Sequence, residues 1–110
     1  MISTISKNTF DALNLSPQCT SLWHRGSEAA WFASDDRDLL GVITSDVRLM
    51  HWTLIICRRR ANGQYGCKRI SSAVGALPKA EQRLVELLHA DECNWEKPDD
   101  VPTRIAEEVA

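Results

Sequence analysis

Basic side chains gather in the middle of this 110-residue sequence. Between Asp46 and Glu81 there are seven basic residues and no acidic one, and five of the seven flank the turn signal Asn62-Gly63. A β-hairpin with cationic arms attracts anions such as phosphates or acidic protein surfaces. The residues expected to contact a partner are most of these cations and two nearby aromatic residues: Arg48, Trp52, Arg58, Arg59, Arg60, Tyr65, Lys68 and Arg69.

The charge of the chain is distributed unevenly along its length. Residues 1–46 carry a net charge of −3, residues 47–80 of +7 and residues 81–110 of −6, which together give the overall −2. Such an asymmetry indicates a directed interaction, or acidic segments that screen the basic one. The competing interpretation is that an exposed hairpin needs charges for solubility and to protect its edges.

Residues that hold metals or catalyse reactions do not occur at useful spacings. The histidines His24, His51 and His89 are separated by 27 and 38 residues, and there is no Cys-x-x-Cys pair. No serine lies in a nucleophile elbow, and the five glycines are too dispersed to form a phosphate loop. We therefore expect no cofactor, no metal site, no small-molecule substrate and no enzymatic activity.

The four cysteines are widely spaced, and we expect them to be reduced thiols that act as small apolar groups. Cys57 and Cys67 flank the predicted hairpin turn, and two turn geometries suit the sequence. A two-residue turn over Asn62-Gly63 places Cys57 opposite Lys68. A three-residue loop with Gly63 in the left-handed conformation places Cys57 opposite Cys67 instead. The sequence does not distinguish between these two registers.

Turn signals and apolar periodicity predict the elements that position these residues. Residues 1–18 are typical of a flexible N-terminal arm, residues 19–93 of a single domain and residues 94–110 of an acidic C-terminal tail. Within the domain, five strands joined by short antiparallel connections are expected at residues 20–25, 29–34, 39–45, 50–57 and 65–74. An amphipathic helix follows over residues 79–89, after Leu77-Pro78. The predicted fold is α+β: a five-stranded antiparallel β-meander with one C-terminal amphipathic helix packed on one face.

Apolar residues occur on both faces of the central predicted strands. In residues 50–57 the two alternating sets are Trp52, Leu54 and Ile56 on one face and Thr53, Ile55 and Cys57 on the other. One face requires the helix, and the other requires a partner or the chain termini. The tryptophans of three neighbouring predicted strands either pack this core or form an exposed protein-binding patch beside the arginines: Trp23, Trp31 and Trp52.

Several short motifs between residues 20 and 90 resemble those of a group of small uncharacterised proteobacterial proteins. In order, the motifs are Trp23-His-Arg-Gly, Trp31-Phe-Ala-Ser, Leu40-Gly-Val, Trp52, Gly63-Gln-Tyr and Leu77-Pro. The resemblance implies a sheet followed by a helix, and it implies no particular activity. The Arg58-Arg59-Arg60 run and the long acidic tail depart from this pattern.

Two functional hypotheses follow from the charge map and the fold. The first is a small non-enzymatic protein-binding or regulatory module, whose partner is another protein or a second copy of itself, met through an uncovered sheet face or an edge strand. The second is nucleic-acid binding through the basic hairpin at residues 57–69, with a phage- or plasmid-encoded inhibitor of a host nucleic-acid-handling complex as a related variant. No segment reads as a secretory signal or a membrane span, so a cytoplasmic protein is expected.

Overall fold

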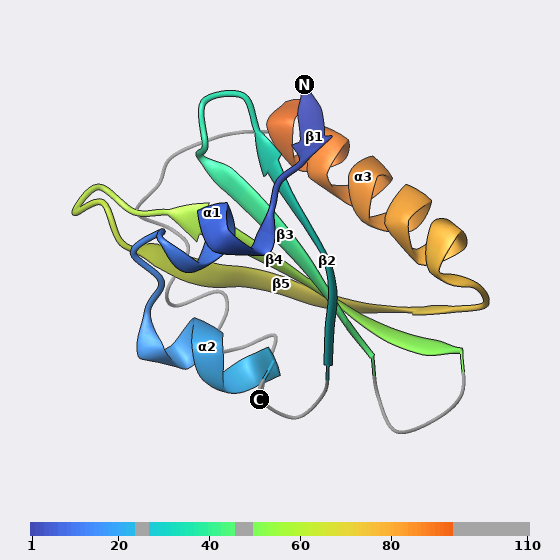
Figure 1. Ribbon diagram of the computed structural model, residues 1–110. Helices are drawn as coiled ribbons and strands as arrows, with labels where there is room; N and C mark the ends of the chain where they lie inside the picture. Colours follow the sequence, from blue (N-terminus) through green and yellow to red (C-terminus); the bar gives the residue numbers. More distant parts are fainter. Residues whose placement is uncertain (24–26, 46–49, 94–110) are drawn as a thin grey trace.

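The computed structural model describes residues 1–23, 27–45 and 50–93 (Figure 1). The predicted acidic tail, residues 94–110, and Arg48 lie outside the described residues. The elements in chain order are β1 (Ile2–Thr4), α1 (Lys7–Asp11), α2 (Pro17–Trp23), β2 (Ser27–Ser34), β3 (Leu39–Ser45), β4 (His51–Arg59), β5 (Tyr65–Val74) and α3 (Leu77–Cys93).

The five strands form one antiparallel sheet in the order β1-β2-β3-β4-β5, so β1 and β5 are its two edges. Helix α3 crosses one face of this sheet, and α1 and α2 lie against the other (Figure 1). The predicted α+β fold, a five-stranded antiparallel sheet with a C-terminal helix packed on it, is therefore confirmed. None of the described helices is long and apolar enough to cross a membrane.

Helix α3 buries its apolar stripe on the sheet. Leu84 and Leu88 are fully buried in a cluster that includes Leu54 and Ile56 of β4. Burial of each such side chain contributes about 1.5–3 kcal/mol. Gly41 in β3 permits the close approach of the helix, because a Cβ atom there would lie only 2.9 Å from Leu88 Cδ1.

The N-terminal segment covers the other face of the sheet, and this corrects the expectation of a flexible arm over residues 1–18. β1 pairs with β2, with Ser3 opposite Ala33. Ser6 caps α1, since its hydroxyl oxygen accepts from the Thr9 amide at 3.1 Å, and the helix places Phe10 fully buried in the core. The apolar side chains on the second face of the sheet are thus covered by the chain itself and are not left exposed for a partner.

The strand expected at residues 20–25 is wrong, because helix α2 occupies Pro17–Trp23. Proline suits the first turn of a helix, and the Ser16 hydroxyl oxygen accepts from the Cys19 amide at 3.2 Å as an N-terminal cap. These local signals outweigh the strand propensity of the aromatic residue that follows. The fifth strand of the sheet is instead β1, which is brought alongside β2 from the start of the chain.

The hairpin between β4 and β5 has the three-residue loop. The Gly63 amide donates to the Arg60 carbonyl and the Arg60 amide to the Gln64 carbonyl, both at 2.9 Å, and Gly63 has φ +87°. Cys57 therefore lies opposite Cys67. A bulge follows at once, because Ile56 is paired with Arg69 and Lys68 is the extra residue.

Candidate functional site

Among the described residues, the predicted partner-binding cations are not gathered on one surface. Arg58 is almost fully buried, at 4% exposure, and lies opposite Gly66 in the sheet. Arg59 forms an ion pair with Asp38 and also donates to the Asp36 carbonyl at 3.1 Å. The guanidinium of Arg60 folds back over Gly66, where a Cβ atom would lie 2.7 Å from Arg60 Cζ. Three consecutive arginines thus face three different environments.

Lys68 and Arg69 share one carboxylate. Asp91 of α3 is itself buried, and its Oδ1 lies 3.0 Å from Lys68 Nζ and 3.6 Å from an Arg69 guanidinium nitrogen. Two of the cations on the hairpin therefore have an internal partner. Sequence reasoning missed this pairing, although Asp91 continues the i, i+3 and i+4 spacing of the apolar stripe from Leu87 and Leu88 and so belongs on the buried side of the helix.

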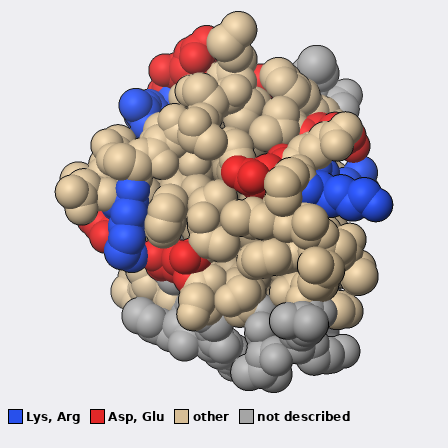
Figure 2. All heavy atoms as spheres, turned by 45° about the vertical axis from the view of Figure 1, so that its right-hand side comes forward, with Lys and Arg blue, Asp and Glu red and all other residues tan. Residues whose placement is uncertain are grey.

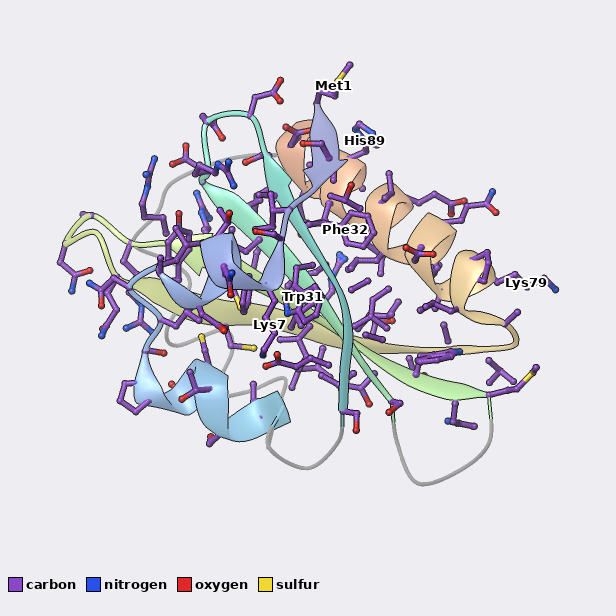
Figure 3. The ribbon with its side chains drawn as sticks, in the orientation of Figure 1. Met1, Lys7, Trp31, Phe32, Lys79 and His89 are labelled. Carbon is purple, nitrogen blue, oxygen red and sulfur yellow. The ribbon has the colours of Figure 1, made fainter. Side chains whose placement is uncertain are left out.

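The two predicted aromatic contacts are structural. The Trp52 indole Nε1 donates to the Gly75 carbonyl at 2.7 Å, and its ring packs on the core beneath α3. Tyr65 is buried in the opposite core, and its hydroxyl donates to the Arg37 carbonyl at 2.5 Å. Burial raises the pKa of the Tyr65 hydroxyl. Trp31 is also partly buried on that face, with Lys7 Nζ 5.6 Å from its ring centre (Figure 3).

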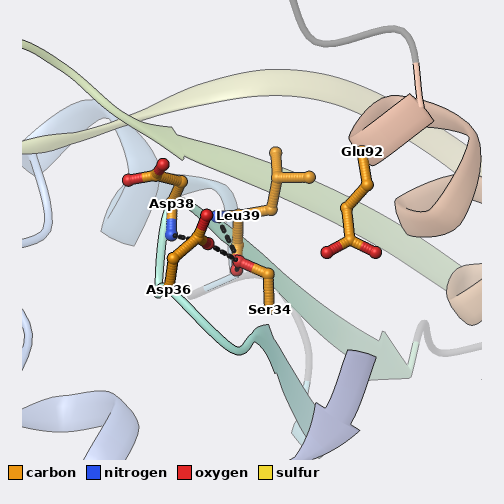
Figure 4. Close-up of a pocket in the computed structure, with 5 residues that line it drawn as sticks. All are labelled: Ser34, Asp36, Asp38, Leu39 and Glu92. Atoms are coloured by element: carbon orange, nitrogen blue, oxygen red, sulfur yellow. Dashed lines mark hydrogen bonds between the residues drawn. The ribbon is translucent and has the colours of Figure 1, made fainter. Parts of the chain in front are cut away.

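An acidic pocket of about 200 Å³ lies at the turn between β2 and β3, facing the end of α3 (Figure 4). Its carboxylates already have partners. Asp36 accepts from the Ser34 hydroxyl at 2.7 Å and from the Asp38 amide at 3.1 Å, and these bonds lower the pKa of Asp36. Asp38 pairs with Arg59, and Glu92 lies 3.4 Å from His89 Nδ1. These contacts of the pocket residues stabilise the turn and the end of the helix.

The described residues, 1–23, 27–45 and 50–93, also form no metal site. No group of three or more histidine, cysteine or acidic side chains in these ranges is placed to hold a metal ion.

The outer edge of β5 is covered only at the start of the strand. At its first residue the edge is paired, because the Tyr65 amide donates to the Asn14 carbonyl at 2.8 Å and the Ser16 amide donates to the Tyr65 carbonyl at 3.0 Å. Beyond Tyr65, no strand among the described residues pairs with this side of β5. The final five residues of the strand, Ile70-Ser-Ser-Ala-Val74, carry no charge and no proline.

Apolar side chains project from this end of the β4–β5 hairpin. Ile70 and Val74 are 37% and 66% exposed, and Met50, just before β4, is 53% exposed. Ile70 pairs with the buried Ile55, so Ile70, Ser72 and Val74 continue the sheet face on which Phe10 is buried. We call the β5 residues 70–74 the open edge.

A groove of about 390 Å³ runs beside the open edge, between β5 and α3. On its helix side it is lined by the side chains of Lys79, Gln82, Arg83 and Glu86. Arg83 pairs with Glu86 at 3.7 Å, which leaves the groove with the positive charge of Lys79. Figure 3 shows Lys79 extending outward from the first turn of α3. The two sides of β5 therefore differ, with an apolar face and a weakly basic one.

The charged side chains visible in Figure 2 form small separate groups of either sign on a largely uncharged face. No single basic surface dominates this face. The chain matches no protein-family model, no curated protein and no solved structure.

Proposed function

We propose that this chain is a non-enzymatic protein-binding module that accepts an extended segment of another protein along the open edge of β5. The observation that carries the proposal is the uncharged run of residues 70–74 at the end of the sheet, with Ile70 and Val74 exposed on it. Edge strands are usually protected by charges, prolines or covering loops, and an unprotected edge is a template for strand addition.

The open edge contrasts with the rest of the same strand. Tyr65 is covered by residues 14–16, and the bulge at Lys68 interrupts the regular ladder beside it. Both features discourage pairing at the start of β5. They restrict the proposed contact to the six residues from Arg69 to Val74, which is the length of an ordinary short strand.

The two faces of β5 specify the chemistry of the partner segment. Alternate side chains of an added strand point to opposite faces. One set would pack on Ile70 and Val74, and the other would point toward the groove that holds Lys79. The expected partner segment alternates apolar and acidic residues. A second copy of this chain is less favoured, because its own residues 70–74 offer no acidic side chain to face Lys79.

Nucleic-acid binding through residues 57–69 is the weaker proposal. Arg59 is paired with Asp38, and Asp91 is shared by Lys68 and Arg69, so three of the five cations of the hairpin have an acidic partner within the chain. Tyr65 is too deeply buried to stack on a base.

Peptide titration followed by NMR tests the proposed function. The probes are two synthetic extended peptides, one alternating valine with glutamate and one alternating valine with lysine. The glutamate peptide should shift the amide signals of residues 69–74 and slow their hydrogen exchange, whereas the lysine peptide should not. Ser72→Lys, which places a charge on the open edge, should abolish the effect. Ser3→Lys, the same change at an exposed position of the opposite edge strand, should preserve it. Binding that leaves the β5 amides unchanged would contradict the proposal.

A further inference from the structure

Three cysteines from different parts of the sequence meet in one core. Cys19 lies on α2, Cys57 on β4 and Cys67 on β5, and all three are buried reduced thiols in the cluster beneath the N-terminal segment. Cys57 and Cys67 are direct cross-strand partners. Figure 3 shows sulfur atoms, drawn in yellow, between α2 and the sheet.

Cys19 has polar neighbours, unlike a cysteine that serves only as a small apolar group in a core. Its thiol donates to the Tyr65 carbonyl at 3.4 Å, and its amide donates to the Ser16 hydroxyl at 3.2 Å. The side chain of Arg60 lies nearby, with its Nε buried and without a hydrogen-bond partner among the described residues. A cation brought beside a buried thiol favours the thiolate form.

The environment affects the thiols of Cys19 and Cys57 in opposite ways. A hydrogen bond from the Cys57 thiol lowers the pKa of Cys19 to about 7, against the opposing effect of burial and with smaller contributions from Ser16 and Arg60. The same contact, together with complete burial, raises the pKa of Cys57. Cys19 is therefore the more readily ionised thiol of the two.

We propose that Cys19 and Cys57 form an intramolecular disulfide when the protein meets a hydroperoxide, with Cys19 attacking and Cys57 resolving. The proposal is independent of the open edge of β5. Its geometric basis is that α2 and β4 bring Cys19 and Cys57 into one buried cluster. The Arg60 guanidinium lies over Gly66, the residue after Tyr65, whose carbonyl accepts from the Cys19 thiol. Because Cys19 is covered, the reaction proceeds through local opening of the short helix α2.

The chemistry balances in two steps. The Cys19 thiolate attacks one peroxide oxygen, the O–O bond breaks, and sulfenic acid and hydroxide form. The Cys57 sulfur then attacks the sulfenic sulfur, an S–S bond replaces the S–OH bond, and the departing hydroxide takes up a proton as water. The thiol proton of Cys57 neutralises the first hydroxide. Overall, two thiols are oxidised to one disulfide and one hydrogen peroxide is reduced to two molecules of water. The product ties α2 covalently to the sheet.

Mass spectrometry of the full chain tests this inference. The experiment uses a Cys93→Ser background, so that the fourth cysteine does not contribute, and hydrogen peroxide as the oxidant. The intact mass should fall by two hydrogen atoms, and peptide mapping should give a Cys19–Cys57 link. Adding Cys67→Ser should preserve this link. Adding Cys57→Ser, which keeps a hydrogen-bond donor, should leave a sulfenic acid on Cys19 that a dimedone probe traps, whereas Cys19→Ser should leave Cys57 unlabelled.

Three results would overturn the proposal. They are a Cys57–Cys67 link, a disulfide between two chains, and reaction of the thiols only under conditions that unfold the protein. Circular dichroism of each variant distinguishes loss of reactivity from loss of folding, and the intact Cys93→Ser protein remains a complete test if either serine variant fails to fold.

Discussion

The Asp91 carboxylate of α3 forms an ion pair with the Lys68 ammonium at 3.0 Å, and this pair joins the end of the C-terminal helix to the bulge in β5. The side chains are only 9% and 17% exposed, and Arg69 approaches the same carboxylate oxygen at 3.6 Å. Two of the seven cations in residues 47–80 are thus paired with a carboxylate from the acidic C-terminal part of the chain.

Replacing Asp91 with asparagine should lower the free energy of unfolding by about 1–3 kcal/mol, because Lys68 loses its charged partner in a largely buried setting. Urea denaturation measures the change. Glu86→Gln is the matched control, since it breaks an exposed pair with Arg83 and should cost less than about 0.5 kcal/mol. Equal losses in the two variants would show that the Asp91 pair is no stronger than a surface contact.

The same Asp91→Asn substitution should increase binding to polyanions. It leaves Lys68 and Arg69 without their shared counter-charge, so retention on heparin should rise and should fall again with added salt. The wild-type chain provides the reference. If both proteins bind heparin equally tightly, Asp91 does not screen these cations, and the case for nucleic-acid binding through the hairpin becomes stronger.

Phe10→Ala should destabilise the protein by about 3–5 kcal/mol, since a fully buried aromatic side chain is removed from the core beneath α1 and α2. Thermal and urea unfolding measure the loss. Asn8→Ala, at an exposed position of the same helix, should change stability by less than about 0.5 kcal/mol. A flexible N-terminal arm would instead make the two variants equivalent.

The sequence predicted the central sheet and the last helix because their signals are local. The alternation of Leu54 and Ile56 with Ile55 and Cys57 fixes a strand that is buried on both faces, and Leu84 with Leu88 fixes the helix face. The missed elements depend on distant pairing. Ile2–Thr4 is too short to be identified as a strand by itself, and it becomes one only beside β2.

The candidate contacts were predicted less well than the fold, and for an electrostatic reason. A run of arginines indicates positive charge, but the neutralising carboxylates of Asp38 and Asp91 lie more than 20 residues away from Arg59 and Lys68 in the sequence. Their pairing depends on how β2, β3 and α3 meet the hairpin. The open edge was identifiable only in general terms, because the register of β5 and the covering of Tyr65 by residues 14–16 are tertiary features.

Gly41→Ala should destabilise the protein by about 1–3 kcal/mol, because the new methyl group meets Leu88 Cδ1 at 2.9 Å and Leu84 Cδ2 at 3.0 Å. Denaturant unfolding of Gly41→Ala, Leu88→Ala and the double variant forms a double-mutant cycle that identifies the origin of the loss. Removing the leucine side chain should relieve the clash, so the combined cost should be smaller than the sum of the single costs. Additive costs would place the strain elsewhere than at the contact between β3 and α3.

Arg60→Gln should shift the pH dependence of Cys19 oxidation to higher pH. The thiolate is the reacting form, so the rate of disulfide formation in the Cys93→Ser protein should rise as the pH increases through about 7, the pKa of Cys19. Removing the Arg60 charge destabilises the thiolate and raises this pKa. A rise of one unit would lower the thiolate fraction at neutral pH by roughly fivefold.

Arg59→Gln is the matched control for this shift, because the neighbouring guanidinium pairs with Asp38 and is not among the main causes of the lowered pKa of Cys19. Its midpoint should stay near that of the parent protein when the rate is followed by intact mass. Gly66→Ala should act like Arg60→Gln, since a methyl group at this position displaces the guanidinium from its place over the strand without requiring an unfavourable backbone conformation. A midpoint that does not move in either the Arg60 or the Gly66 variant would show that Arg60 has no part in activating Cys19.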